Sequence, residues 1–189
     1  MTPKEKRDRL FRVSRPHFRP AVLVDENGYG YDMGLLWAAY KAGSFPLAGN
    51  LSEAEFAEHI VALGTTLTGA MMVEDDCAKY SSGRGPVALI SIRSDGWRVE
   101  PHVDYFKWAG KRTALRVSVA FFQMARYSKD VGSCVVSSLK DTENLFNHVC
   151  EYGVLHPVGR VPKGSVRGDV YMFSVTGKKE IRSQEALAA

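Results

Sequence analysis

Three ionisable side chains lie two residues apart near the middle of the chain, in an apolar run over 99–106 that is expected to form a strand. They are Glu100, His102 and Asp104, and a strand places them on one face. A carboxylate or an imidazole there could remove a proton from an ammonium group, directly or through one water. Repulsion between the carboxylates would raise a carboxyl pKa. The alternative is a strand with a solvated polar face. The same side chains could bind a metal, but the sequence shows no additional metal ligand beside them, so we expect no metal site.

The expected strand runs into a short basic segment, 107–113 (KWAGKRT), which is followed by an apolar-striped helix expected over 114–127. The first amides of a helix have no partners within the helix, and the helix dipole adds positive charge at that end. The cations in or next to this segment are Lys107, Lys111, Arg112 and Arg116. The layout favours an anion-binding site. An ordinary connection between strand and helix with a solvated basic rim is the alternative.

The three cysteines are Cys77, Cys134 and Cys150, an odd number whose spacing matches no zinc-binding pattern. Cys134 lies in an apolar strand-like run, and Cys150 is expected on the inward side of a helix. A nucleophilic cysteine would need a paired histidine and a lowered pKa. We therefore expect reduced thiols in the core.

The composition describes a folded chain that is neither disordered nor embedded in a membrane. Hydrophobic residues make up 45% of the 189 residues, the mean hydropathy is -0.18, and no apolar run approaches the ~20 residues of a membrane span. The net charge is +4, with much of the excess in residues 1–20. Such a basic segment could contact an acidic surface of another protein chain, bind nucleic acid, or only solubilise the terminus.

Turn and periodicity signals around these residues predict the elements that must position them. Helices are expected over 31–41, from a Ser52–Glu55 capping box onward, over 114–127, and from 141 or 142 to the stop signal Gly153. Strands are expected over 21–25, 68–74, 86–93, 97–106, 131–137, 154–161 and 170–175. Residues 1–20 are expected to be an irregular arm, 21–176 a domain and 177–189 a polar tail.

This order predicts an α+β (mixed α/β) domain with a single mixed sheet flanked by helices. An antiparallel meander would pass into a β-α-β segment. Strand 99–106 would then lie beside strand 131–137 and parallel to it.

The element order over residues 21–176 resembles the GCN5-related N-acetyltransferase (GNAT) fold, and PHVDYFKWAGKRTALR is similar to a segment of phage-encoded GNAT-like proteins. The resemblance implies that backbone groups of Val103 and Tyr105 hold the pantetheine arm of acetyl-CoA. It implies that the following segment holds the pyrophosphate. The residues concerned are Lys107, Gly110, Lys111, Arg112, Thr113 and Ala114.

The same resemblance shows departures from the family pattern. The usual loop has Gln or Arg, two residues, Gly, one residue, then Gly or Ala. Here Lys107 takes the first position and Arg112 the last. An arginine there could obstruct the approach of a ligand or add charge toward a phosphate. The tyrosine common in the family's next helix is replaced by Val149.

Two functional hypotheses follow. The first is an acetyl-CoA-dependent N-acyltransferase, in which a residue such as Glu100 deprotonates an amine acceptor. The second, which the departures favour, is a phage-type structural or assembly protein with a degenerate acyl-CoA site and no required cofactor. It would contact other protein chains through its termini and lie in the host cytoplasm or the virion.

Overall fold

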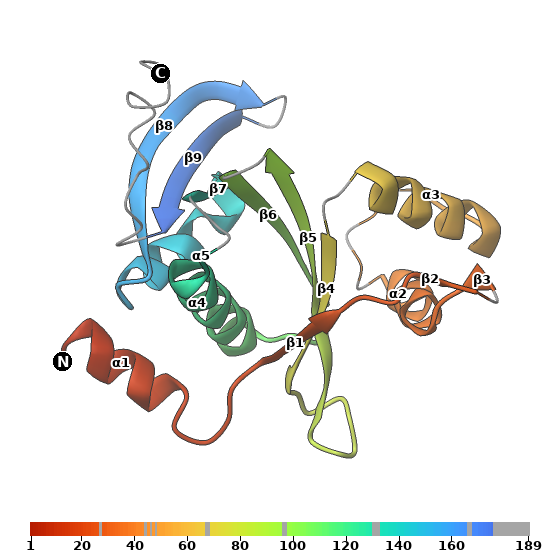
Figure 1. The fold of residues 1–189 in the computed structure, drawn as a ribbon, viewed down its shortest axis with the longest axis horizontal. Helices are drawn as coiled ribbons and strands as arrows, with labels where there is room; N and C mark the ends of the chain where they lie inside the picture. Colours follow the sequence, from red (N-terminus) through yellow and green to blue (C-terminus); the bar gives the residue numbers. More distant parts are fainter. Residues whose placement is uncertain are drawn as a thin grey trace. The chain divides into compact units, whose positions relative to one another are not determined.

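The computed structural model describes residues 1–26, 28–43, 45, 47, 49–66, 69–95, 98–129, 133–165 and 168–175. Side chains are described for these residues except 63–66, 95 and 139–141. The helices and strands, labelled in Figure 1, are α1 Pro3–Leu10, β1 His17–Pro20, β2 Val24–Asp25, β3 Gly28–Tyr29, α2 Tyr31–Lys41, α3 Glu53–Thr66, β4 Gly69–Asp76, β5 Arg84–Asp95, β6 Arg98–Tyr105, α4 Lys111–Tyr127, β7 Ser133–Leu139, α5 Lys140–Cys150, β8 Leu155–Ser165 and β9 Gly168–Val175. No helix among the described residues is long and apolar enough to cross a membrane.

The described strands form one mixed sheet in the order β1-β4-β5-β6-β7-β9-β8, with a separate β2–β3 hairpin. The pair β6–β7 is parallel and joins Arg98 to Ser133 and Val99 to Cys134. The pairs β1–β4, β4–β5, β7–β9 and β8–β9 are antiparallel. The predicted α+β class, the single mixed sheet and the parallel pair are confirmed.

Local signals located most helices well. Helix α2 has the predicted bounds. At the start of α3, the Ser52 backbone N–H donates to Glu55 Oε2 at 2.8 Å, as a capping box requires. Gly153 follows α5 with φ +66°, the left-handed conformation expected there. Helix α4 begins at Lys111, one turn before the predicted start.

The expectation that residues 1–20 are irregular is wrong, because α1 and β1 both lie there. In α1, Glu5 N–H donates to Thr2 Oγ1 and Thr2 N–H donates to Glu5 Oε2. Pro3 occupies the first helical position. The strand predicted over 21–25 is also wrong in extent, since only β2 forms there. The predicted domain bounds stay a prediction, and residues 177–189 lie outside the described residues.

The described residues group into two compact units. The first, called the loop unit, comprises Ser14–Arg93 and His102–Val117. The second, called the hairpin unit, comprises Met1–Val13, Ser94–Pro101 and the described part of Ser118–Ala189.

The core of the loop unit is aromatic and aliphatic. Tyr40 and Phe56 stack with ring centroids 5.0 Å apart, and Phe45 meets Phe56 edge-on at 6.0 Å. Phe106, directly after β6, is buried in the same cluster. The end of β6 is therefore fixed by core packing.

The core of the hairpin unit is a chain of three phenylalanines. Phe122 of α4 lies 6.2 Å from Phe146 of α5, and Phe146 lies 5.5 Å from Phe173 of β9. Helix α1 joins this unit at the turn after α5, where Lys6 Nζ pairs with Glu151 Oε2 at 2.8 Å.

Candidate functional site

In the loop unit, the strand–loop–helix segment is built from a short turn on a buried anchor. Phe106 N–H donates to the Val87 carbonyl at 3.0 Å, which ties the residue after β6 to β5. Ala109 N–H then donates to the Phe106 carbonyl at 2.8 Å, and Ala114 N–H to the Gly110 carbonyl at 3.0 Å. The first bond closes a turn, and the second is the first step of α4. The turn therefore joins the fixed end of β6 directly to the N-terminus of α4.

The backbone amides of Lys111, Arg112 and Thr113 form the first turn of α4. Within the described ranges, these three amides donate to no protein acceptor. The side chains of Lys111 and Arg112 are exposed on the same turn. Oriented amides, the helix dipole and two cations together suit an anion such as a phosphate group.

Gly110 precedes this turn, and the chain itself does not require a glycine there. Its φ is not positive, and a Cβ built on it would meet no atom within 4 Å. Because Gly110 has no side chain, a ligand could approach the backbone closely at this point.

Trp108 is held on the β4–β5 connection and anchors the loop. Its indole N–H donates to the Pro86 carbonyl at 2.8 Å. Lys79 Nζ lies 3.1 Å from the centroid of its ring, and Cys77 Sγ donates to its carbonyl at 3.6 Å. These contacts involve both the indole ring and the backbone carbonyl of Trp108, so its role in the described chain is packing.

Lys107, the first lysine of the loop, lies near the C-terminal end of α2. A Cβ built on Gly43 would lie 3.3 Å from Lys107 Nζ, so the ammonium sits just past α2. The carbonyl end of a helix favours a cation.

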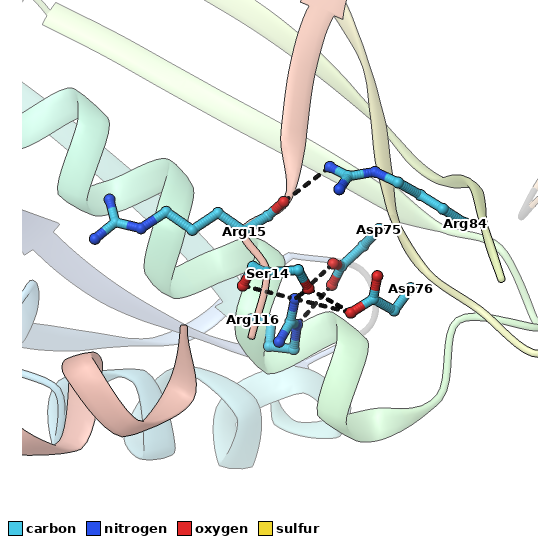
Figure 2. A network of polar contacts seen from close by, with 6 residues as sticks. All are labelled: Ser14, Arg15, Asp75, Asp76, Arg84 and Arg116. Atoms are coloured by element: carbon cyan, nitrogen blue, oxygen red, sulfur yellow. Dashed lines mark hydrogen bonds and ion pairs between the residues drawn. The ribbon is translucent and has the colours of Figure 1, made fainter. Parts of the chain in front are cut away.

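Arg116 is not available to an anion, which corrects its predicted contribution to the charge of the loop. Its Nε and Nη2 donate to the two carboxylate oxygens of Asp75, each at 2.8 Å (Figure 2). Nη2 also donates to Ser14 Oγ at 2.8 Å. Asp75 is fully buried and Arg116 is 6% exposed. The paired carboxylate raises the pKa of Arg116 and cancels its charge locally.

His102 and Asp104 form a pair on β6. His102 Nε2 lies 3.1 Å from Asp104 Oδ1. The hydrogen bond to Asp104 raises the pKa of His102, while burial and Arg93 act in the opposite direction. The imidazole can accept a proton only above this raised pKa, when it is neutral.

Glu100 belongs to the hairpin unit and has a different partner. Ser137 Oγ of β7 donates to Glu100 Oε1 at 3.4 Å. The two strands are paired only up to Val99 and Cys134, so this contact lies just beyond the end of their ladder. The structure thus pairs His102 with Asp104 and Glu100 with Ser137. Among the described residues, no three His, Cys, Asp or Glu side chains gather as a metal site.

The other residues singled out by sequence are structural. Cys77 and Cys134 are buried, as predicted, and Val149 is fully buried in the core. Cys150 is half-buried, and burial raises the pKa of its thiol. A raised pKa disfavours the nucleophilic thiolate.

Comparison with known proteins shows which of them share this fold. No protein-family model matches the chain. No curated protein matches it either.

Solved structures do match. Spermidine N-acetyltransferase from Vibrio cholerae in complex with CoA and spermine is 12% identical, with a TM-score of 0.58 over 87% of this chain and 97% of that chain. A probable GNAT-family acetyltransferase from Chromobacterium violaceum is 15% identical, with a TM-score of 0.59 over 85% of this chain and 82% of that one. A GNAT-family acetyltransferase from Streptococcus pneumoniae is 13% identical, with a TM-score of 0.52 over 86% and 100%. At these identities the likeness defines the fold, which is that of GNAT acetyltransferases.

Proposed function

We propose that the chain is an acyl-CoA-dependent N-acyltransferase that acts on an amine. The observation that carries the proposal is the first turn of α4 beside Gly110, whose three amides donate to no acceptor in the part of the chain that the structure describes. The Vibrio cholerae protein of the same fold was solved with CoA and a polyamine. A phosphate-binding turn in a fold used by acetyltransferases supports this reaction class more than any other.

In this proposal the chain holds acetyl-CoA in two places. Backbone groups of Val103 and Tyr105 on β6 bind the pantetheine arm. The amides from Gly110 to Ala114 bind the pyrophosphate, and Lys111 and Arg112 add charge-assisted contacts. Lys107 remains a proposed ligand, although its ammonium lies beside Gly43.

Acetyl-CoA supplies an acyl group as a thioester. The chain must bring the amine to that group in its neutral form, because an ammonium has no lone pair for attack. Glu100, or neutral His102 held by Asp104, accepts the proton. The new C–N bond forms as the C–S bond breaks, the attacking nitrogen releases its second proton, and the CoA thiolate takes up that proton.

Isothermal titration of the purified chain with acetyl-CoA and with CoA tests the proposal. We expect micromolar binding of both. Gly110→Trp should abolish it, because the indole would fill the space in front of the α4 amides. Gly34→Trp is the matched control, since a Cβ at the exposed Gly34 also meets no atom within 4 Å. Binding that survives Gly110→Trp unchanged, or no binding at millimolar ligand, would sink the proposal.

The sequence-based hypothesis of a virion assembly protein gains no support. The matching proteins reported above are bacterial acetyltransferases, and no phage protein is among them. Helix α1 also contacts its own chain, since Lys6 pairs with Glu151. Contact with other chains or with nucleic acid through the termini stays a prediction. Deletion of residues 1–15 tests it, because normal assembly of the truncated chain would count against it.

A further inference from the structure

The strands of the hairpin unit present one face to the helices. Cys134 and Val136 of β7 and Phe173 of β9 are all buried on this face. Phe173 meets Phe146 of α5, which in turn meets Phe122 of α4. Alternate residues of a strand point to opposite faces. The residues between these buried ones therefore face away from both helices.

That second face is the one that carries Glu100. None of its described members on β7 and β9 is fully buried; they are Ser133, Val135, Ser137, Val170, Met172 and Ser174. Since Ser137 donates to Glu100 at 3.4 Å, the carboxylate lies on the same face.

A row of four residues crosses this face from strand to strand, with a step of two residues along the strand between β6 and β7. Glu100 on β6 contacts Ser137 on β7, Ser137 is paired with Met172 on β9, and Met172 is paired with Gly159 on β8. We call these four residues the Glu100–Gly159 row. At the usual spacing of neighbouring strands and the usual rise per residue, the three strand spacings and the two-residue step span about 16 Å.

The row ends at Gly159, where no side chain projects from the sheet. A Cβ built on Gly159 would meet no atom within 4 Å, and its φ is not positive, so the backbone does not demand glycine. Beside it, Met172 is half-buried and presents a flexible thioether that can adapt to an apolar ligand. The surface at Met172 and Gly159 can therefore contact a narrow apolar chain.

The charge of the row lies at one end only. Glu100 is its one ionisable member, and the diagonal neighbours Val135 and Val170 are apolar. Arg98, two residues before Glu100, adds a positive charge on the same face. A ligand with a single ammonium would pair it with Glu100, and its carbon chain would contact Met172 and Gly159. A second ammonium along the row would meet no carboxylate, so it would gain no ion pair, and it would displace apolar contact with Met172.

We propose that the Glu100–Gly159 row binds the acceptor and selects a primary monoamine with an unbranched apolar chain over a polyamine. This inference rests on the proposed acyltransferase function. It separates the chain from the spermidine N-acetyltransferase that shares its fold.

Calorimetric titration of the full chain with n-octylamine and with spermidine, two amines of comparable length, tests the selection. We expect n-octylamine to bind at least roughly tenfold more tightly. Glu100→Gln should weaken n-octylamine by a similar factor. Gly159→Val should weaken n-octylamine as well, but leave n-propylamine unchanged, because a three-carbon chain held at Glu100 does not reach β8. Arg160→Met is the matched control, since Arg160 is the neighbour of Gly159 on the opposite face of β8.

Tighter binding of spermidine, or n-octylamine affinity that Gly159→Val does not change, would overturn the inference. Titration of the same samples with acetyl-CoA separates the two proposals. If acetyl-CoA binds and spermidine is preferred, the selectivity is wrong and the acyltransferase function stands. If n-octylamine binds as expected and acetyl-CoA does not, the acyltransferase function is wrong and the row is an amine site without that reaction.

Discussion

At the scale of single residues, four cations near one helix start have three different fates. Arg116 is buried against Asp75, and Lys107 lies beside Gly43. Lys111 and Arg112 are exposed on the first turn of α4. Of the four, Arg116 is the one whose approach to an anion would break an ion pair. The positive charge of the loop is therefore reduced by the ion pair of Arg116 with Asp75.

The His102–Asp104 pair predicts a measurable titration. Because the pKa of His102 is raised in the folded chain, the charged imidazole stabilises the fold. That contribution is fully present below the unfolded pKa and is lost as the pH rises through the folded one. We expect Asp104→Asn to lower the His102 pKa toward its ordinary value, measured from the imidazole proton shifts by NMR.

The Asp104→Asn substitution keeps the size of the side chain and removes its charge, so it isolates the electrostatic cause. An unchanged titration midpoint in this variant would contradict the pairing.

The buried Arg116–Asp75 pair predicts strong and asymmetric effects on stability. Arg116→Met leaves the Asp75 carboxylate buried without its partner, and we expect a loss of about 3 kcal/mol or more in the free energy of unfolding. Adding Asp75→Leu removes the orphaned charge and should recover most of that loss. Urea denaturation of the single and double variants measures both.

The exposed ion pair of Arg160 with Asp169 is the control. Arg160→Met should leave the midpoint of denaturation unchanged, because water screens the pair. If Arg116→Met were equally silent, the buried pair would not stabilise the fold.

At the scale of elements, helix α1 depends on the turn that follows α5. Arg7 donates to the Tyr152 carbonyl, and Arg126 donates to the Gly153 carbonyl at 3.2 Å. These cations meet carbonyl groups at the end of a helix, where the dipole favours positive charge. The turn therefore holds α1 and the end of α4 to α5.

Gly153 is the residue of this turn that tolerates least change. Its φ is +66°, and a Cβ would lie 2.9 Å from Pro3 Cβ of α1. We expect Gly153→Ala to cost roughly 1–2 kcal/mol for the left-handed conformation alone, with a further loss from the contact with α1. Thermal denaturation measures it.

Gly159→Ala is the matched control, because that glycine has an ordinary φ and open surroundings. Equal melting temperatures for Gly153→Ala and the unmodified chain would show that α1 does not pack against this turn.

At the scale of the whole molecule, the three thiols report on both units. Cys77 lies in the loop unit, and Cys134 and Cys150 lie in the hairpin unit. In the folded chain we expect only Cys150, the half-buried one, to react with a disulfide reagent, and slowly because its pKa is raised. In denaturant all three should react at once, as counted by absorbance of the released thiol.

Rapid reaction of two thiols without denaturant would contradict the burial of Cys77 or Cys134. Loss of protection at Cys77 before Cys134 as denaturant increases would show that the two units unfold separately.

The sequence by itself determined the elements whose signals are local. The capping box at Ser52, the helical spacing over 31–41 and the glycine after α5 each act within a few residues, so spacing alone predicts them. The parallel neighbour of β6 followed from the order of elements. Apolar spacing predicts the start of α4 one turn late, because the exposed first residues of the helix have no apolar period. The same criterion does not predict helix α1, since none of its residues is buried.

Only the tertiary structure decided which side chains meet. Arg116 finds Asp75, 41 residues earlier in the chain, and Glu100 finds Ser137, 37 residues later. The Glu100–Gly159 row depends on the register of four strands, whose order in the sheet, β6-β7-β9-β8, differs from their order in the chain. Sequence spacing carries periodicity within one element, but partners across a sheet are set by strand pairing and packing, which no local pattern contains.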